Sequence, residues 1–330
     1  MTDLQAPFPW FGGKRRVAAE VWSRLGDTPN YVEPFAGSLA TLLGRPVKHV
    51  GKIETINDLD GYLANFWRSV SLDPEATARY ADWPVNENDL TARHVWLTSQ
   101  RDGFQKRLEG DPEFYDPRVA GWWVAGVCGW IGGGYCAGGG PWQSVDGLLT
   151  NIKSNAGQGV NRQLPHLGNA GQGVNRQLPH LGDAGQGGIY EWFNMLASRL
   201  RNVRVTSGDW TRVVTESVTT RHGVTGLFLD PPYGSEVEQT RVYASDSGSV
   251  AADVRQWCIE NGNDRLMRIA LCGYAGEGHE QLLDHGWESH AWKTSGGYGG
   301  GRGGTGDENR AKERIFYSPH CLGAVDEGLF

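Results

Sequence analysis

Several features that would place a chain in the membrane, in the secretory pathway or among zinc proteins are missing from these 330 residues. No apolar run approaches the length that spans a bilayer, and no charged-apolar signal segment opens the chain. The five cysteines are scattered without a Cys-x-x-Cys pair, which argues against a zinc site and for a reducing compartment. We therefore expect a cytoplasmic protein that needs neither a membrane nor a metal ion.

Positive charge is also scarce, because 31 Lys and Arg residues stand against 38 Asp and Glu residues, a net charge of −7. This balance counts against nucleic-acid binding, since contacts with phosphates dominate affinity. The distribution of the positive charges along the chain partly answers this objection to nucleic-acid binding. Residues 151–182 hold Lys153, Arg162 and Arg176 without any acid, and residues 293–314 carry further cations among glycines. A local basic surface is enough for an acidic protein that must also release its DNA.

The most informative motif is Asp230-Pro231-Pro232-Tyr233, which directly follows the apolar run 226–229. A short buried strand that ends in this way presents a carboxylate, rigid carbonyls and an aromatic ring at the edge of a sheet where α/β proteins bind ligands. Such a group suits a flat ring that bears an amine: Asp230 and a proline carbonyl accept from the amine, and Tyr233 stacks on the ring. An ordinary surface turn is the alternative.

A second motif, Phe8-Pro9-Trp10-Phe11-Gly12-Gly13-Lys14, precedes a predicted helix over residues 15–25. Its two glycines let the backbone approach a ligand, the lysine offers a cation and the tryptophan an aromatic wall. The spacing excludes a nucleotide-binding P-loop. Taken alone, the segment is also compatible with a plain N-terminal loop.

A third motif, Tyr31-Val32-Glu33-Pro34-Phe35-Ala36-Gly37-Ser38, predicts a strand, a glycine turn and the start of a helix over residues 39–43. Backbone amides at such a turn suit a carboxylate. A second predicted strand, residues 53–56, ends at Asn57-Asp58. An acid at that position can hold ribose hydroxyls, although Asp58 could instead cap the predicted helix over residues 59–70.

In this order, the motifs resemble those of the Dam-type DNA adenine methyltransferases, which use S-adenosylmethionine. The resemblance is specific at four places and loose in the middle of the chain. It implies an α/β fold with a Rossmann-like methyltransferase sheet and an inserted target-recognition region. The four places are Trp10 to Lys14, Val32 to Gly37, Asn57-Asp58 and Asp230 to Tyr233.

The resemblance also implies the residues that contact the cofactor. In the family these include the tryptophan, the lysine, the acid after the second strand and the aspartate of the tetrapeptide, and Asp209 resembles the acid that approaches the cofactor's adenine. One departure stands out, because Leu39 occupies the place of a second glycine that usually follows Gly37, so we expect the loop to run differently. The expected cofactor-binding residues are Trp10, Gly12, Gly13, Lys14, Glu33, Pro34, Phe35, Gly37, Asp58, Asp209 and Asp230.

The alternation of strand and helix signals breaks after residue 71 and returns at residue 189. We therefore expect a catalytic domain made of residues 1–71 and 189–330, with an inserted target-recognition region over residues 72–188. The later predicted elements are helices over residues 189–200 and 250–260 and strands over residues 203–206, 226–229, 268–272 and 314–317.

The insertion contains a 14-residue segment, residues 155–168, that recurs unchanged over residues 169–182. Two interpretations remain open: a flexible loop that tolerates changes in length, or a surface whose Asn, Arg, Gln and His side chains face DNA. The DNA-contact candidates are Lys153, Arg162 and Arg176. For the tryptophans upstream, Trp122, Trp123 and Trp130, we expect a place in the core.

The sequence thus predicts a site-specific DNA methyltransferase that transfers a methyl group from S-adenosylmethionine to the N6 amine of adenine in double-stranded DNA by base flipping. Its catalytic residues would be Asp230, Pro231, Pro232 and Tyr233, without a metal ion. The setting would be a bacterial or phage-infected cell, with or without a partner restriction enzyme. The alternatives are the same chemistry on RNA adenine or a protein glutamine, and an inactive DNA-binding relative.

Overall fold

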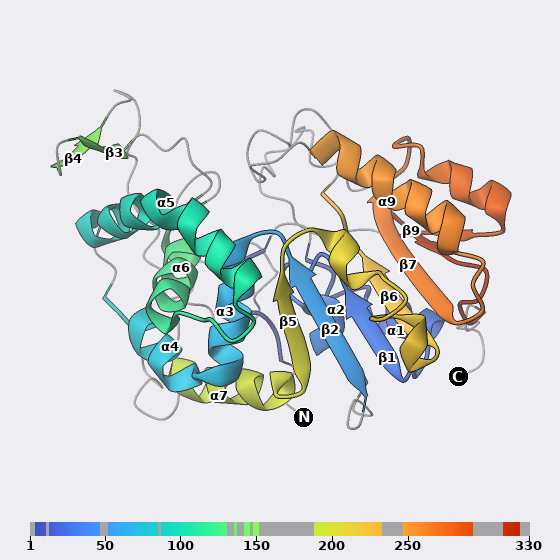
Figure 1. Cartoon of the computed structure of the whole chain (residues 1–330), viewed down its shortest axis with the longest axis horizontal. Helices are drawn as coiled ribbons and strands as arrows, with labels where there is room; N and C mark the ends of the chain where they lie inside the picture. The colour runs from blue at the N-terminus through green and yellow to red at the C-terminus, as the bar shows by residue number, and fades with distance from the viewer. Residues whose placement is uncertain are drawn as a thin grey trace.

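Seven strands form one sheet in the computed structural model (Figure 1). The structure describes residues 4–10, 13–46, 52–84, 87–130, 135–136, 142–145, 148–151, 188–232, 247–292 and 313–323. In spatial order the strands are β5 (Val203–Ser207), β2 (Ile53–Asp58), β1 (Asn30–Glu33), β6 (Thr225–Leu229), β7 (Met267–Tyr274), β9 (Glu313–Tyr317) and β8 (Glu288–Ala291).

The strand order reverses direction between β1 and β6. From β1 the chain builds outward through β2 to β5 and then returns to β6, on the other side of β1. Strands β5, β2, β1, β6 and β7 pair in parallel, and β9 is antiparallel to both of its neighbours. Open sheets bind ligands at the carboxyl ends of the strands where the order reverses. The predicted Rossmann-like α/β fold is confirmed.

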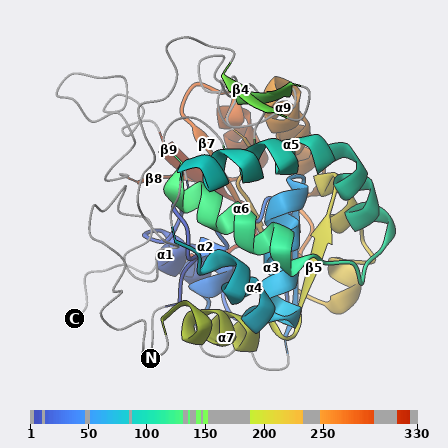
Figure 2. The ribbon, with the colours of Figure 1, turned by 90° about the vertical axis from the view of Figure 1, so that its left-hand side faces the viewer.

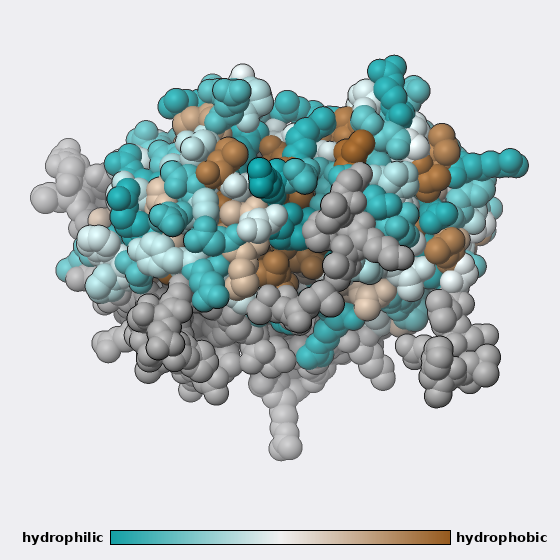
Figure 3. Space-filling model, turned by 90° about the horizontal axis from the view of Figure 1, so that it is seen from below, coloured by the Kyte–Doolittle hydropathy of each residue, from teal (hydrophilic) through white to brown (hydrophobic). Residues whose placement is uncertain are grey.

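Alternate residues of the central strands enter two separate hydrophobic cores. Tyr31 and Phe228 belong to the core on one face, whereas Val32, Leu227 and Leu229 belong to the other. The first core is covered by α1 (Ala18–Leu25) and α2 (Ala40–Leu43), and the second by α9 (Ser247–Asn261). Seen from below, the described surface is mostly hydrophilic with scattered apolar patches (Figure 3).

A helical lobe stands beside the sheet (Figures 1 and 2). The long helix α3 (Gly61–Leu72) links the two parts, because it packs on β5 as well as on four other helices of the lobe. A small antiparallel hairpin lies next to α5 (Figure 1). The remaining elements of the lobe are α4 (Pro74–Ala81), α5 (Glu87–Gly110), α6 (Pro117–Gly129), α7 (Gly188–Leu200) and the hairpin strands β3 (Trp142–Val145) and β4 (Leu148–Asn151).

Most of the predicted helices and strands are present. The structure differs from the prediction at the start of α1, at strand β8 and in the burial of two tryptophans. The helix predicted from residue 15 begins at Ala18, because Val17 N donates to Lys14 O and closes a turn first. Strand β8 was not predicted, since its four residues, Glu-Ser-His-Ala, are all exposed and carry no apolar pattern. Among the tryptophans, Trp123 is buried as expected, whereas Trp122 and Trp130 are partly buried at the margin of the core.

A buried ion cluster connects β2 to the helices around it. The carboxylate of Glu54 lies 2.9 Å from Arg45 and 2.7 Å from Arg199, which comes from α7. Arg199 also donates to Leu42 O in α2. Removing one member would leave an uncompensated buried charge, so the cluster fixes how the chain returns to the sheet after the lobe. None of the described helices combines the length and apolarity needed to cross a membrane.

Candidate active site

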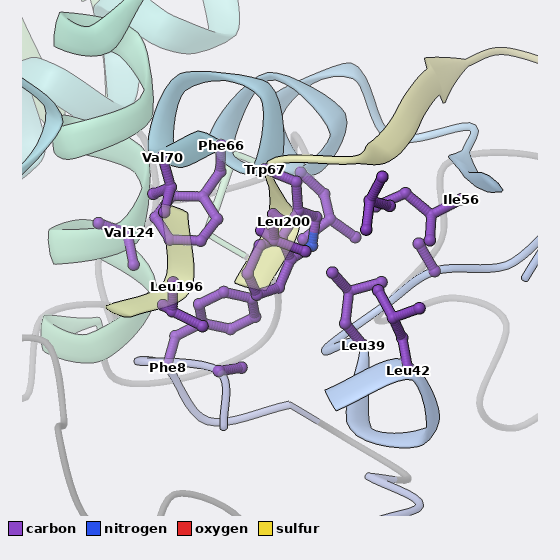
Figure 4. Packing of buried hydrophobic residues seen from close by; sticks show 14 of the residues in the cluster. Phe8, Leu39, Leu42, Ile56, Phe66, Trp67, Val70, Val124, Leu196 and Leu200 are labelled. Atoms are coloured by element: carbon purple, nitrogen blue, oxygen red, sulfur yellow. The ribbon is translucent and has the colours of Figure 1, made fainter. Parts of the chain in front are cut away.

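The N-terminal segment is anchored by an aromatic ring in the core. Phe8 is buried, and its ring lies 5.4 Å from that of Phe66, 5.8 Å from Trp67 and 5.2 Å from Trp123 (Figure 4). Upstream, the indole of Trp192 donates to Gln5 O at 3.1 Å. Because both ends of this segment are fixed to the lobe, the residues after Phe8 reach the carboxyl edge of the sheet in a defined position.

Lys14 and Asp230 form the central ion pair of this edge. The Lys14 ammonium lies 3.0 Å from the Asp230 carboxylate, and the two side chains are 3% and 22% exposed. Burial alone would lower the pKa of Lys14, but the negative charges around it, first that of Asp230, outweigh this effect and raise the pKa. The lysine therefore stays charged. Two motifs more than 200 residues apart, one before α1 and one after β6, meet here.

Glu33, at the end of β1, is a buried carboxyl close to this pair. The hydroxyl of Tyr31 donates to it at 3.0 Å. Burial raises the pKa of Glu33 well above its usual range, and the charge of Asp230 adds to the shift. Both effects disfavour a second negative charge beside Asp230.

Gly37, in the loop after β1, is held by three side chains. Its N–H donates to Asp58 at 3.0 Å, and its carbonyl accepts from the indole of Trp67 at 3.0 Å. The indole of Trp10 lies so close that a Cβ at Gly37 would come within 2.7 Å of its nitrogen. With φ at +47° as well, this position requires glycine.

Asp58 and Asp60 have separate tasks at the end of β2. Asp60 caps α3 by accepting from Tyr62 N, so the alternative that Asp58 is the cap is wrong. Asp58 is partly buried and accepts from the N–H groups of Gly37 and Asp60. Burial raises the pKa of Asp58 to about 7, although these hydrogen bonds lower it. Its ionisation is thus poised near neutral pH.

Asn57 is a positioning residue that the motif analysis did not single out for the site. Its side-chain amide is buried and donates to Pro34 O at 3.1 Å and to Gly208 O at 2.9 Å. It thereby joins the loops that follow β1 and β5. Only its place beside Asp58 in the motif could have indicated it, because both acceptors are backbone atoms.

The other predicted residues follow the ends of the strands or lie outside the described part of the chain. Phe35 stacks on Trp210 at 6.1 Å between ring centroids. Asp209 is exposed and caps a short 3-10 helix, Trp210–Val213, by accepting from Thr211 N. Pro231 is buried, and Gly13 and Pro232 keep some exposure. The predicted residues that lie outside the described part of the chain are Gly12, Tyr233, Lys153, Arg162 and Arg176.

A family model of D12 class N6 adenine-specific DNA methyltransferases matches residues 10–107. The match identifies an adenine-specific DNA methyltransferase. The matched segment contains Trp10, Lys14, Gly37 and Asp58, so the resemblance predicted from the motifs is confirmed. No curated protein matches the chain. Among the residues that the structure describes, no group of three or more His, Cys, Asp or Glu side chains is arranged to hold a metal ion.

Leu39 shows how this methyltransferase accommodates the missing glycine. Its φ and ψ are +54° and +26°, a left-handed conformation that glycine adopts without strain. For a residue with a Cβ this costs about 1–2 kcal/mol. The side chain is fully buried with Leu42, Ile56 and Trp67 (Figure 4). Burial of the leucine side chain offsets the strain of its left-handed backbone.

We therefore expect the free energy of unfolding of Leu39→Gly to equal that of Leu39→Ala or to exceed it by up to about 1 kcal/mol. Both variants lose the buried side chain, at a cost of about 2–5 kcal/mol, but only glycine relieves the backbone. Urea unfolding of both variants measures the difference. Leu42 in the adjacent helix is the matched control, where glycine should be the less stable by roughly 1 kcal/mol. The same order at both positions would contradict the strain at Leu39.

Proposed function

We propose that this methyltransferase transfers the methyl group of S-adenosylmethionine to the N6 amine of an adenine that is flipped out of double-stranded DNA. The observation that carries the proposal is the Lys14–Asp230 ion pair at the end of β6, two strands away from Asp58 at the end of β2. A carboxylate that is held in one orientation at this edge suits an amine that must be aimed rather than strongly activated.

The residues around these strand ends fit the chemical groups of the proposed cofactor. Asp58 would accept from the ribose hydroxyls, as acids at the end of the second strand do in dinucleotide folds. The indole nitrogen of Trp10 lies against Gly37, and the ring of Trp10 would form an aromatic wall of the cofactor site. When bound, the cofactor supplies a methyl group activated by a sulfonium. The proposed set is Trp10, Gly12, Gly13, Lys14, Glu33, Pro34, Phe35, Gly37, Asp58, Asp209 and Asp230.

The chain's own part in the reaction would be to orient the amine. Asp230 and the carbonyl of Pro231 would accept its two hydrogens, which draws the nitrogen lone pair out of conjugation and directs it at the methyl carbon. Lys14 would hold the Asp230 carboxylate in place. The amine nitrogen would take the methyl group while the electron pair of the broken carbon–sulfur bond stays with the cofactor, and the methylated nitrogen would pass one proton to Asp230. The buried Pro231 would hold the carbonyl rigid.

Extruding the adenine costs a few kcal/mol, and stacking on Tyr233 would recover about 1–3 kcal/mol of it. We retain residues 72–188 as the proposed target-recognition region, with Lys153, Arg162 and Arg176 as its DNA contacts. The helices and hairpin of this region contribute no strand to the sheet. A region built in this way can vary its DNA contacts without altering the catalytic edge.

The test is sequencing that detects modified bases, applied to plasmid DNA from a methylation-deficient host that expresses this chain. We expect N6-methyladenine in one short shared motif. Asp230→Asn should lower the transfer rate by at least about 100-fold, because the neutral amide cannot accept in the same way. Asp253→Asn, an exposed aspartate on α9, is the matched control and should keep wild-type activity. Near-normal transfer by a folded Asp230→Asn variant would contradict the mechanism.

Binding of the cofactor should strengthen as the pH rises through 7. The pKa of Asp58 is about 7, and only its ionised form accepts both ribose hydroxyls well. Calorimetry should give a dissociation constant for S-adenosylmethionine about tenfold lower at pH 8 than at pH 6. Asp58→Asn, titrated with the same ligand, removes the contribution of Asp58 to the pH dependence of the dissociation constant and leaves the contribution of the ligand's own ionisation. An unchanged pH profile in this variant would exclude Asp58 from the site.

A further inference from the structure

Arg101, on α5, contacts the backbone of a turn that belongs to the proposed recognition region. Its guanidinium donates to Cys136 O at 3.0 Å. The N–H of Cys136 donates to Nδ1 of His94, also on α5, at 3.2 Å. Both sides of one residue are therefore fixed to the same helix. Since Nδ1 accepts, the neutral His94 carries its proton on Nε2.

The Tyr135–Cys136 turn has a conformation that needs such support. Cys136 has a φ of +64° although it is not glycine, and its side chain is buried. The ring of Tyr135 packs so tightly on α6 that a Cβ at Gly126 would come within 2.0 Å of it. Strained residues persist only where their surroundings hold them, and they gather at functional positions.

The helix that carries Arg101 also contacts the end of β2. Burial raises the pKa of Asp60, which follows β2, and the charge of Arg101 opposes part of that rise. Asp60 N donates to Asp58 at 2.9 Å, and the Asp60 side chain accepts from Tyr62 N. The hydroxyl of Tyr62 in turn donates to Leu97 O on α5. Leu97 and Arg101 are one helical turn apart, so the contact of α5 with Tyr62 lies next to its contact with Cys136.

The Tyr135–Cys136 turn belongs to the region proposed to recognise DNA, and the Asp58–Asp60 corner belongs to the proposed cofactor site. Cys136 lies between the end of α6 and the start of β3, and the β3–β4 hairpin packs next to α5 (Figure 1). Asp58 is the proposed ribose ligand. Helix α5 thus holds the Cys136 turn through Arg101 and the Asp58–Asp60 corner through Leu97 and Tyr62, and a shift of this helix would change its contacts with both.

We propose that Arg101 is a positioning residue that couples the two sites: cofactor bound at Asp58 strengthens DNA binding, and DNA strengthens cofactor binding, through Tyr62, helix α5, Arg101 and Cys136. This inference rests on the proposed function. By linkage, the factor by which each ligand improves the affinity of the other must be the same.

The test measures DNA affinity with and without S-adenosylhomocysteine, which carries no methyl group to transfer, on a short duplex that contains the motif found by sequencing. Cofactor affinity with and without the duplex closes the cycle. In the wild type we expect a coupling factor of at least about fivefold. In Arg101→Met the factor should fall to about one, while the cofactor affinity without DNA changes less than about threefold. Arg101→Lys, which keeps the charge, should restore part of the coupling.

Lys106→Met is the matched control, since Lys106 is exposed on the same helix. This variant should keep the wild-type coupling factor between cofactor binding and DNA binding. A purely structural or DNA-contacting role of Arg101 would lower DNA affinity equally with and without cofactor, and that result would overturn the proposal while leaving the proposed function intact. If the folded wild type binds neither ligand, the proposed function fails and the coupling fails with it.

Discussion

The salt bridge between Lys14 and Asp230 is the interaction on which the candidate active site depends. It joins a segment before the first helix to the end of the fourth strand along the chain in the sheet, and the lysine is almost fully buried. Burying a charge is costly unless it is paired, so Asp230 stabilises the buried charge of Lys14. Phe8 packs in the core of the lobe and fixes the segment that leads to Lys14. Packing in the lobe therefore contributes to the orientation of the carboxylate that we assign to the target amine.

A second set of contacts keeps the neighbouring loops in register. Gly37, Asn57 and Asp58 connect the ends of three adjacent strands through hydrogen bonds to backbone atoms. Such bonds fix the path of a loop without dictating its sequence. This explains how Leu39 can replace a glycine: its buried side chain compensates for the left-handed backbone, and the contacts at Gly37 remain.

Much of the fold could be predicted, because the central strands are short apolar runs between turn signals and the motifs fall where those strands end. Strand β8 could not, since it has no apolar pattern and forms by pairing with β9. In the site, Lys14, Gly37, Asp58 and Asp230 followed from motifs. The tasks of Trp67 and Asn57 did not, because their partners are carbonyls brought near by tertiary packing. Arg101 was hidden for the same reason, since it contacts Cys136 O across 35 positions.

The central claim is that Lys14 and Asp230 act as one unit in methyl transfer. The most direct measurement is a double-mutant cycle, in which single-turnover methyl transfer to duplex DNA is compared for Lys14→Met, Asp230→Asn and the double variant. Our account predicts that each single change slows transfer and that the double variant is no more than about threefold slower than Asp230→Asn. Losses that multiply in the double variant would show that the two residues act independently and would contradict the account.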